Sequence, residues 1–306
     1  ILEPGILEGL SSVEYLTIES NEIEVIKPYS FIGLSNLVFL HLSKNKITEL
    51  SNNTFSGLEN VRYLYLEDTN LKTVNAGAFL GLSNLTLLHL SNNNIVQIHS
   101  DAFVRLEKLE TLLLGKNQIK AISADVFKPL SNLISLQLSE NELDNLESDV
   151  LTALVNLIHL DLPGNKIKQL PEGILRPLKS LGSLYFGNND IKVFTRKTIP
   201  KAPPLLYLYL NNGNIEEIES DAFEDLKLLS QIHLNDNKIK HLDNKTFAGL
   251  NGLYYIDLSN NDISDLNPQL FYNLPSLRRV VLDWNNIEPN ALEEIYKRYP
   301  EFIHLI

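Results

Sequence analysis

The nearest approach to a hydrolytic site in this sequence is a histidine and an aspartate close together in the chain, His159 and Asp161. Ser135 precedes His159 and Ser183 follows it, each by the same separation in sequence. Serine, histidine and aspartate can supply a nucleophile, a base and an orienting carboxylate, but a working triad also needs oxyanion donors, usually inside a pocket. The strands predicted from the repeat pattern place these residues on an open sheet. We therefore expect that the protein is not an enzyme.

Few other residues could take part in catalysis or bind a metal or a cofactor. Cysteine is absent, which excludes disulfides, zinc–thiolate sites and cysteine nucleophiles. Three histidines, His41, His89 and His233, fall on separate predicted strands without the spacing of a metal site. No glycine-rich phosphate loop occurs. The sequence accordingly predicts no cofactor and no metal.

A 24-residue repeat positions all of these residues. The segment from Leu37 to Ile47 fits the pattern L-x-x-L-x-L-x-x-N-x-I. Its first position is Leu or Val in all twelve copies, with no insertion or deletion between them: Val13, Leu37, Val61, Leu85, Leu109, Leu133, Leu157, Leu181, Leu205, Leu229, Leu253 and Leu277. The L-x-L part alternates inward and outward as a strand does. A fixed period of this length is typical of a solenoid.

Two further columns of the repeat have structural roles. The position where the chain leaves each strand is Asn in ten of twelve copies, with Thr69 and Gly213 as the departures. A side-chain amide there can bond backbone groups of the turn and of the adjacent repeat. A later position, first occupied by Phe31, is Phe in eight of eleven copies. We expect these rings to stack as a spine behind the strands.

The sequence thus predicts an α/β solenoid of about 12 repeats. Strands at a spacing of about 4.8 Å, backed by bulkier outer segments, predict a horseshoe with a parallel sheet on its concave side. We predict one domain over residues 1–306, with a partial repeat at 1–12, repeats at 13–287 and a C-terminal cap at 288–306.

The cap is predicted to be a helix. Asn290, followed by Glu293, has the spacing of a capping box. A helix from Ala291 to Tyr299 would end before Pro300 and turn Ile295 toward the last strand.

The unit L-x-x-L-x-L-x-x-N-x-I-x-x-I-x-x-x-x-F-x-x-L-x-x resembles the typical 24-residue class of extracellular animal leucine-rich repeats. Toll-like receptor ectodomains, chaoptin-like adhesion proteins and secreted mosquito leucine-rich immune proteins share it. The resemblance covers essentially the whole chain and implies an extracellular recognition protein, secreted or on the outer face of the plasma membrane. The sequence departs from the family in lacking the cysteine clusters that usually flank such arrays.

The amino-acid composition limits the kinds of partner that the protein is expected to bind. The formal net charge is −12, from 38 acidic and 26 basic residues, and this balance argues against a polyanion such as nucleic acid. No run approaches the roughly 18 consecutive apolar residues of a membrane span. The first residues, Ile1 to Gly5, lack a starting Met and the basic-then-apolar layout of a signal peptide. We expect a mature or trimmed segment.

Tyrosine is concentrated beside the framework leucines, at positions that should face solvent. Eight of the twelve tyrosines lie there: Tyr15, Tyr63, Tyr65, Tyr185, Tyr207, Tyr209, Tyr254 and Tyr255. Tyr and Trp are enriched in binding hot spots, although aromatic residues also simply suit strands. The predicted ligand-binding surface comprises a later group, which we favour, and an earlier one: Tyr185, Tyr207, Tyr209, His233, Tyr254, Tyr255 and Trp284, then Phe39, His41, Tyr63 and Tyr65.

Three N-x-S/T sequons predict a glycoprotein, with glycans at Asn52, Asn84 and Asn244. The sequence as a whole predicts a module that binds a protein, in preference to a glycan or lipid, through the concave face. The family resemblance implies innate immunity or cell-surface recognition. A homophilic adhesion or receptor ectodomain, with homo-oligomers, and a structural matrix component are the alternatives.

Overall fold

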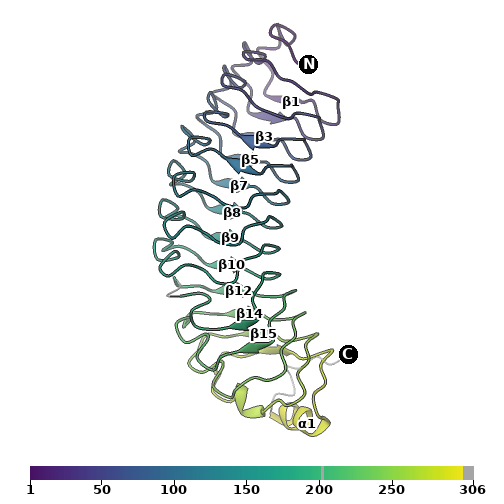
Figure 1. The fold of residues 1–306 in the computed structure, drawn as a ribbon, viewed down its shortest axis with the longest axis vertical. Coiled ribbons are helices and arrows are strands. Elements are labelled where there is room, and N and C mark those ends of the chain that lie inside the picture. Colours follow the sequence, from purple (N-terminus) through teal and green to yellow (C-terminus); the bar gives the residue numbers. More distant parts are fainter. Residues whose placement is uncertain (201–202, 299–306) are drawn as a thin grey trace. The chain divides into compact units, whose positions relative to one another are not determined.

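The protein is a β-solenoid with a parallel sheet and one C-terminal helix, and the computed structural model describes residues 1–200 and 203–298. The chain divides into two compact units, Ile1–Leu157 and Ile158–Ile306, here called unit 1 and unit 2. Each repeat supplies one three-residue strand, a turn and an outer segment, and the strands follow one another along each unit (Figure 1). The leucine-rich solenoid predicted from the repeat is confirmed, whereas the single domain stays a prediction.

Unit 1 carries six strands of the sheet: β1 Tyr15–Thr17, β2 Phe39–His41, β3 Tyr63–Tyr65, β5 Leu87–His89, β7 Thr111–Leu113 and β8 Ser135–Gln137. Each pairs in parallel with the next at an offset of one repeat, so that Phe39 lies beside Tyr63. Because side chains alternate along a strand, the middle leucine points into the core and its two neighbours face outward. Leu40 and Leu64 are fully buried accordingly.

Unit 2 carries the corresponding strands β9 His159–Asp161, β10 Ser183–Tyr185, β12 Tyr207–Tyr209, β14 Gln231–His233, β15 Tyr255–Asp257 and β16 Arg279–Val281. Their parallel register is again one repeat, which sets Tyr185 beside Tyr209 and Tyr209 beside His233. A 3₁₀ helix, η1 Pro268–Phe271, and the helix α1 Pro289–Arg298 follow in the last repeats.

Short strand pairs in the outer segments were not predicted. In unit 1, β4 Thr73–Val74 pairs with β6 Gln97–Ile98, and in unit 2, β11 Val193–Phe194 pairs with β13 Glu217–Ile218. Each is a parallel pair only two residues long. They tie neighbouring repeats together on the side of the solenoid away from the main sheet.

The asparagine column forms the expected ladder. In unit 1, the Asn117 amide donates to the carbonyl oxygens of Leu90 and Leu114, both at 3.0 Å, and accepts from the Ile95 N–H at 3.0 Å. One side chain thus serves its own turn and the preceding repeat, where backbone groups have no strand partner. At the first departure, Thr69 keeps one backbone bond, from its hydroxyl to the Leu66 carbonyl at 3.2 Å.

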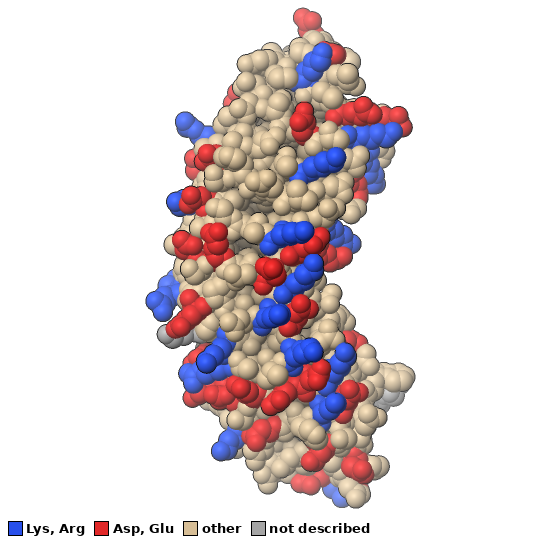
Figure 2. Space-filling model, viewed as in Figure 1, with Lys and Arg blue, Asp and Glu red and all other residues tan. Residues whose placement is uncertain are grey.

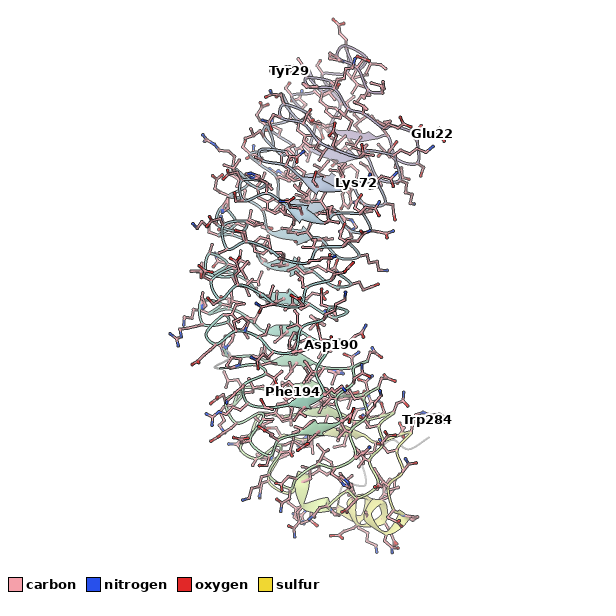
Figure 3. The ribbon with its side chains drawn as sticks, viewed as in Figure 1. Glu22, Tyr29, Lys72, Asp190, Phe194 and Trp284 are labelled. Atoms are coloured by element: carbon pink, nitrogen blue, oxygen red, sulfur yellow. The ribbon has the colours of Figure 1, made fainter. Side chains whose placement is uncertain are left out.

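The phenylalanine spine is also confirmed where ring contacts are described. The rings of Phe31, Phe55, Phe79 and Phe103 stack in sequence at centroid distances of 6.0–6.1 Å. In unit 2, Phe194 (Figure 3) stacks on Phe223 at 5.1 Å, joining the spine from outside the column.

The turn after each strand passes through the left-handed region at one position per repeat. Ser20, Lys44, Asp68 and their counterparts in the later repeats all have positive φ values, and one of these counterparts is Gly164. Glycine and short polar residues adopt this conformation most easily. In the last copy the residue is Trp284, with φ 58°, so a bulky aromatic side chain occupies a turn that disfavours it.

The helix prediction was correct in kind but wrong at its start. Helix α1 begins at Pro289, which places Asn290 inside the first turn rather than at the cap. Proline suits a first helical position because its fixed φ matches the helix and its missing N–H would have no partner there. Glu293 pairs instead with Lys297 at 2.9 Å. Ile295 is buried as expected, whereas Tyr299 and Pro300 lie outside the described residues.

Candidate recognition surface

In unit 2, four predicted residues form a continuous stack of rings across four strands. The Tyr185 and Tyr209 rings are 4.3 Å apart and inclined by 8°, and Tyr209 and His233 are 4.4 Å apart at 16°. Tyr255 leans on His233 at 5.0 Å and 39°, and the Arg279 guanidinium lies 5.6 Å from the Tyr255 ring centre. We call Tyr185, Tyr209, His233 and Tyr255 the aromatic ladder.

Burial favours the neutral forms of three ladder side chains, Tyr209, His233 and Tyr255. Burial, helped by the neighbouring Tyr185, raises the pKa of Tyr209. Burial and then the Asp257 carboxylate raise the pKa of Tyr255 to about 12. Burial also lowers the pKa of His233 below its ordinary value of 6.5, although Asp257 opposes the shift. The stack therefore presents neutral rings with polar tips, the pattern that suits a protein interface.

Neighbouring polar groups hold one end of the ladder in place. The Tyr255 hydroxyl donates to Asp257 Oδ2 at 3.1 Å. The other oxygen, Asp257 Oδ1, accepts from the Ser259 hydroxyl at 2.6 Å and from its N–H at 3.0 Å. The sequence predicted that these side chains would be open to solvent. In the structure they are half-buried, because they cover one another.

Three other residues of the later group stand apart from the ladder. No ring contact is described for Tyr207, Tyr254 or Trp284. Tyr254 is exposed, and Trp284 is 81% exposed. Trp284 lies at the margin of the ribbon, on the turn after β16 (Figure 3). The structure thus separates the later group into the aromatic ladder, the half-buried Tyr207, and two exposed rings, Tyr254 and Trp284.

In unit 1 the earlier group forms a tilted cluster instead of a stack. Phe39 lies 5.2 Å from Tyr65 at 41° and 6.1 Å from Tyr15 at 35°. His41 and His89 flank Tyr65 at 5.3 and 5.9 Å, inclined by 58° and 73°. Tyr63 is exposed and makes no described ring contact. Unlike Tyr185, Tyr209 and His233, these rings are tilted or perpendicular to one another rather than stacked.

Two carboxylates complete this cluster. His41 Nε2 lies 3.1 Å from Glu19 Oε2 and 3.7 Å from Glu67 Oε1. His89 Nδ1 lies 3.2 Å from Glu67 Oε2. Burial lowers the pKa of His89 below 6.5, while Glu67 and Asp68 oppose the shift and His41 adds to it. Carboxylates and imidazoles therefore alternate across the repeats, in the order Glu19, His41, Glu67 and His89.

Sequence reasoning missed Glu19, Glu67, Asp257 and Arg279 as parts of these surfaces. A signal for the first two existed, because each lies two positions beyond an outward-facing strand residue and the alternation carries it to the same face. Apart from Tyr254 and Trp284, the predicted surface was confined to the strands themselves and so left this column out.

One of the two serines at the sequence positions flanking His159 is inaccessible. His159 on β9 pairs in register with Ser183 on β10, but Ser183 is 4% exposed, too enclosed for a nucleophile that must reach a substrate. Within the described chain, no three His, Asp or Glu side chains converge closely enough to hold a metal ion. Nor is any described helix long and apolar enough to cross a membrane.

Comparison with known protein families identifies the family to which the repeat belongs. The family described as leucine rich repeat matches residues 11–71, 60–119, 107–167, 131–191, 179–239, 203–263 and 229–287. The chain belongs to the leucine-rich-repeat family. No curated protein matches it significantly.

Solved structures of other leucine-rich-repeat proteins share the fold. The chain is similar to TLR13 in its complex with ssRNA13 (TM-score 0.73, 24% identity), covering 99% of this chain and 52% of TLR13. It thus spans about half the length of that receptor chain. It is also similar to a chain in a complex of latrophilin 3, Unc5D and FLRT2 (TM-score 0.77, 23% identity, 91% and 84% covered). A third is an internalin from Listeria monocytogenes (TM-score 0.69, 20% identity, 97% and 88% covered).

The three sequons of this leucine-rich-repeat chain differ in their surroundings. Asn52 and Asn244 are exposed in the outer segments. The Asn84 amide is engaged: its Nδ2 donates to the Glu59 carbonyl at 2.7 Å, and its Oδ1 accepts from Lys108 Nζ at 2.6 Å. A glycan on Asn84 would replace one hydrogen of that nitrogen, so the first two sites are the better placed.

Proposed function

We propose that this leucine-rich-repeat chain is an extracellular recognition module that binds a protein partner through the exposed face of its sheet, the face predicted to be concave. The aromatic ladder of unit 2 is the proposed central contact. The observation that carries this proposal is the pair of near-parallel ring contacts at 4.3 and 4.4 Å, which join Tyr185, Tyr209 and His233 in the unliganded chain.

The stack supports binding because it is already ordered. Fixing a flexible side chain at an interface costs about 0.5–1.5 kcal/mol, and the ladder rings have lost most of that freedom before a partner arrives. Tyrosine supplies a large contact area together with a hydroxyl that can donate or accept. Stacked rings keep their faces inside the ladder and offer their edges and hydroxyls to a partner, which suits carbonyl-rich protein surfaces.

The similar structures support a protein ligand. Toll, at 21% identity over 91% of this chain and 41% of its own, was solved in a complex with Spatzle that is described as a hub in Drosophila development and innate immunity. Roles in innate immunity or cell-surface recognition belong to this proposal. TLR13 was solved in a complex with ssRNA13, so nucleic acid is kept as an outcome to be tested. On the face shown in Figure 2, acidic and basic side chains are intermixed without a broad basic area.

Glycans at Asn52 and Asn244 are proposed as well. Both lie on outer segments rather than on the sheet, so that glycans there would leave the ladder open. Mass spectrometry of the chain secreted from insect cells should find both modified. Unmodified Asn52 and Asn244 in a secreted, folded product would remove this part of the proposal.

The test is affinity capture from the extracellular fluid of the source organism. The bait is the wild-type chain or the triple variant Tyr185→Ser/Tyr209→Ser/Tyr255→Ser. Tyr29→Ser is the matched control, because Tyr29 is an exposed tyrosine outside the sheet (Figure 3). We expect one protein to be retained by wild type and control and lost from the triple variant, provided that circular dichroism shows all three folded.

Other outcomes point elsewhere. Equal retention by the triple variant would refute the ladder as the contact, and a nucleic acid in place of a protein would refute the class of partner. If nothing is retained, sedimentation at rising concentration separates homophilic pairing, the first alternative, from a structural role.

A further inference from the structure

The most enclosed carboxylate of the unit 1 cluster, Glu67, has no lysine or arginine partner among the described residues. Its side chain is 20% exposed, and its neighbours are the imidazoles of His41 and His89. Although His89 Nδ1 is 3.2 Å from Oε2, that oxygen is shielded from solvent and accepts no well-aligned hydrogen bond. An enclosed charge is costly unless it is paired.

Two other glutamates in unit 1 are paired with lysine although they are more exposed. Glu3 lies 2.9 Å from Lys27, and Glu22 lies 3.2 Å from Lys46, with glutamate exposures of 48% and 84%. In the described part of the chain, neither Glu19 nor Glu67 forms an ion pair with a lysine or an arginine. The need for a counter-charge is thus greatest where the chain supplies none.

The rings around these carboxylates are arranged to receive a cation. The faces of aromatic rings are electron-rich and attract guanidinium and ammonium groups. Because Phe39 is tilted by 35° against Tyr15 and by 41° against Tyr65, these rings do not stack face to face as Tyr185, Tyr209 and His233 do. Tyr15 is 69% exposed.

We propose that the sheet face of unit 1 is a second, separate binding site. It takes an arginine side chain of a partner protein against the Phe39 and Tyr65 rings, where the guanidinium bridges the Glu19 and Glu67 carboxylates on the solvent side of the His41 imidazole that lies between them. A guanidinium fits better than an ammonium, because it is planar, stacks on ring faces and donates to two carboxylates at once. The site rests on the geometry of unit 1 alone and stands whether or not the aromatic ladder binds.

The other charged groups on this face are compatible with a cationic ligand. Glu14 directly precedes Tyr15 at the start of β1, and Asp68 follows Glu67. Arg62, beside Tyr63, is exposed and comes before Glu67 at the opposite end of β3. Acidic groups therefore outnumber basic ones around the proposed site.

The test uses NMR titration of the intact chain with three probes, N-acetyl-arginine-N-methylamide and the matching citrulline and lysine compounds. Citrulline has nearly the same shape but carries no charge. We expect arginine to shift the ring signals of His41, His89 and Tyr65, with a dissociation constant on the order of 1 mM for so small a ligand. Citrulline and the corresponding lysine compound should bind at least about tenfold more weakly.

Three variants complete the design. Glu67→Gln should weaken arginine binding at least about tenfold, whereas Glu107→Gln, a change at an exposed outer position, should leave it unaltered. Phe39→Leu should weaken it without altering charge, which provides a second reading if Glu67→Gln disturbs the fold. Equal shifts by arginine and citrulline, or unaltered binding by Glu67→Gln with native ladder signals, would overturn the proposal. Lysine binding as tightly as arginine would overturn the guanidinium assignment.

Discussion

Replacing the stacked tyrosines singly and together should reveal an energetic coupling between them. Tyr209 contacts a ring on each side, at 4.3 and 4.4 Å, whereas Tyr185 contacts one. An aromatic pair contributes about 0.5–1.5 kcal/mol beyond the area it buries. With leucine keeping most of the apolar area, Tyr185→Leu should lower the free energy of unfolding by about 0.5–1.5 kcal/mol and Tyr209→Leu by about twice that.

The double variant should cost less than the sum of the single ones. Once Tyr209 is gone, Tyr185→Leu removes no ring contact, so the interaction energy should be about 1 kcal/mol. Urea denaturation followed by circular dichroism provides all four free energies, with equal m-values as a check that one transition is measured. Tyr15 and Phe39, at 6.1 Å and 35°, form the control pair and should couple more weakly.

Two results would refute this reasoning. An interaction energy below about 0.3 kcal/mol lies within the additivity of independent sites and would mean that the rings lie together without stabilising one another. Coupling equal to that of Tyr15 and Phe39 would mean that the closer, flatter stacking has no energetic effect. Either result would remove the argument that the ladder is held ready for a partner.

Three further predictions concern the ladder of amides, the strained turn and a buried imidazole. Asn117→Ala should destabilise the chain by about 2–4 kcal/mol in urea denaturation, because it leaves the Ile95 N–H and several carbonyls without partners. A loss below about 1 kcal/mol would contradict the stabilising role of the asparagine column. Trp284→Asn should raise the free energy of unfolding by about 0.5–1 kcal/mol in thermal melting, because asparagine suits a φ of 58° and removal of an exposed ring loses little packing. A lower melting temperature would show that the Trp284 ring packs against the rest of the protein. Because burial lowers the pKa of His89, the unfolded chain takes up a proton first, and stability should fall as the pH drops below about 6.5. Glu67→Gln should lower that pKa further in an NMR titration, and an upward shift would be inconsistent with the cause assigned.

The strands and the buried columns were predictable because the repeat has no insertion. Once Leu40 pairs with Leu64, its counterpart in the next repeat, every residue at the same offset falls into one column. The ladder of amides followed from the same spacing, since Asn117 must meet the same backbone groups as Asn93 one repeat earlier. A strict period converts sequence position directly into spatial position.

Features that depend on a few local residues were not predictable in this way. The outer pair of β4 and β6 is two residues long, and its Val74 and Ile98 occupy a column that is apolar in other described repeats where no such pair forms. The helix start depended on whether Pro289 or Asn290 opened the first turn, and a proline at the first helical position displaced the predicted cap. Boundaries of this kind are decided by single residues rather than by the repeat.

Ring geometry was the other feature hidden from the sequence, and it gives the two aromatic surfaces opposite preferences. Both contain tyrosine and histidine at the same column, with Tyr65 in unit 1 and Tyr185 and Tyr209 in unit 2. In unit 1 the neighbouring column holds Phe39, whose ring reaches Tyr65 at 5.2 Å and 41°. The place beside Tyr185 is taken by the small, buried Ser183, which leaves room for flat stacking at 8°. Stacked rings turn edges and hydroxyls outward and favour acceptors, whereas tilted rings expose faces and favour cations. A large neighbour does not by itself tilt the rings, because Tyr207 stands to His233 as Phe39 stands to Tyr65, and His233 still lies flat on Tyr209 at 16°.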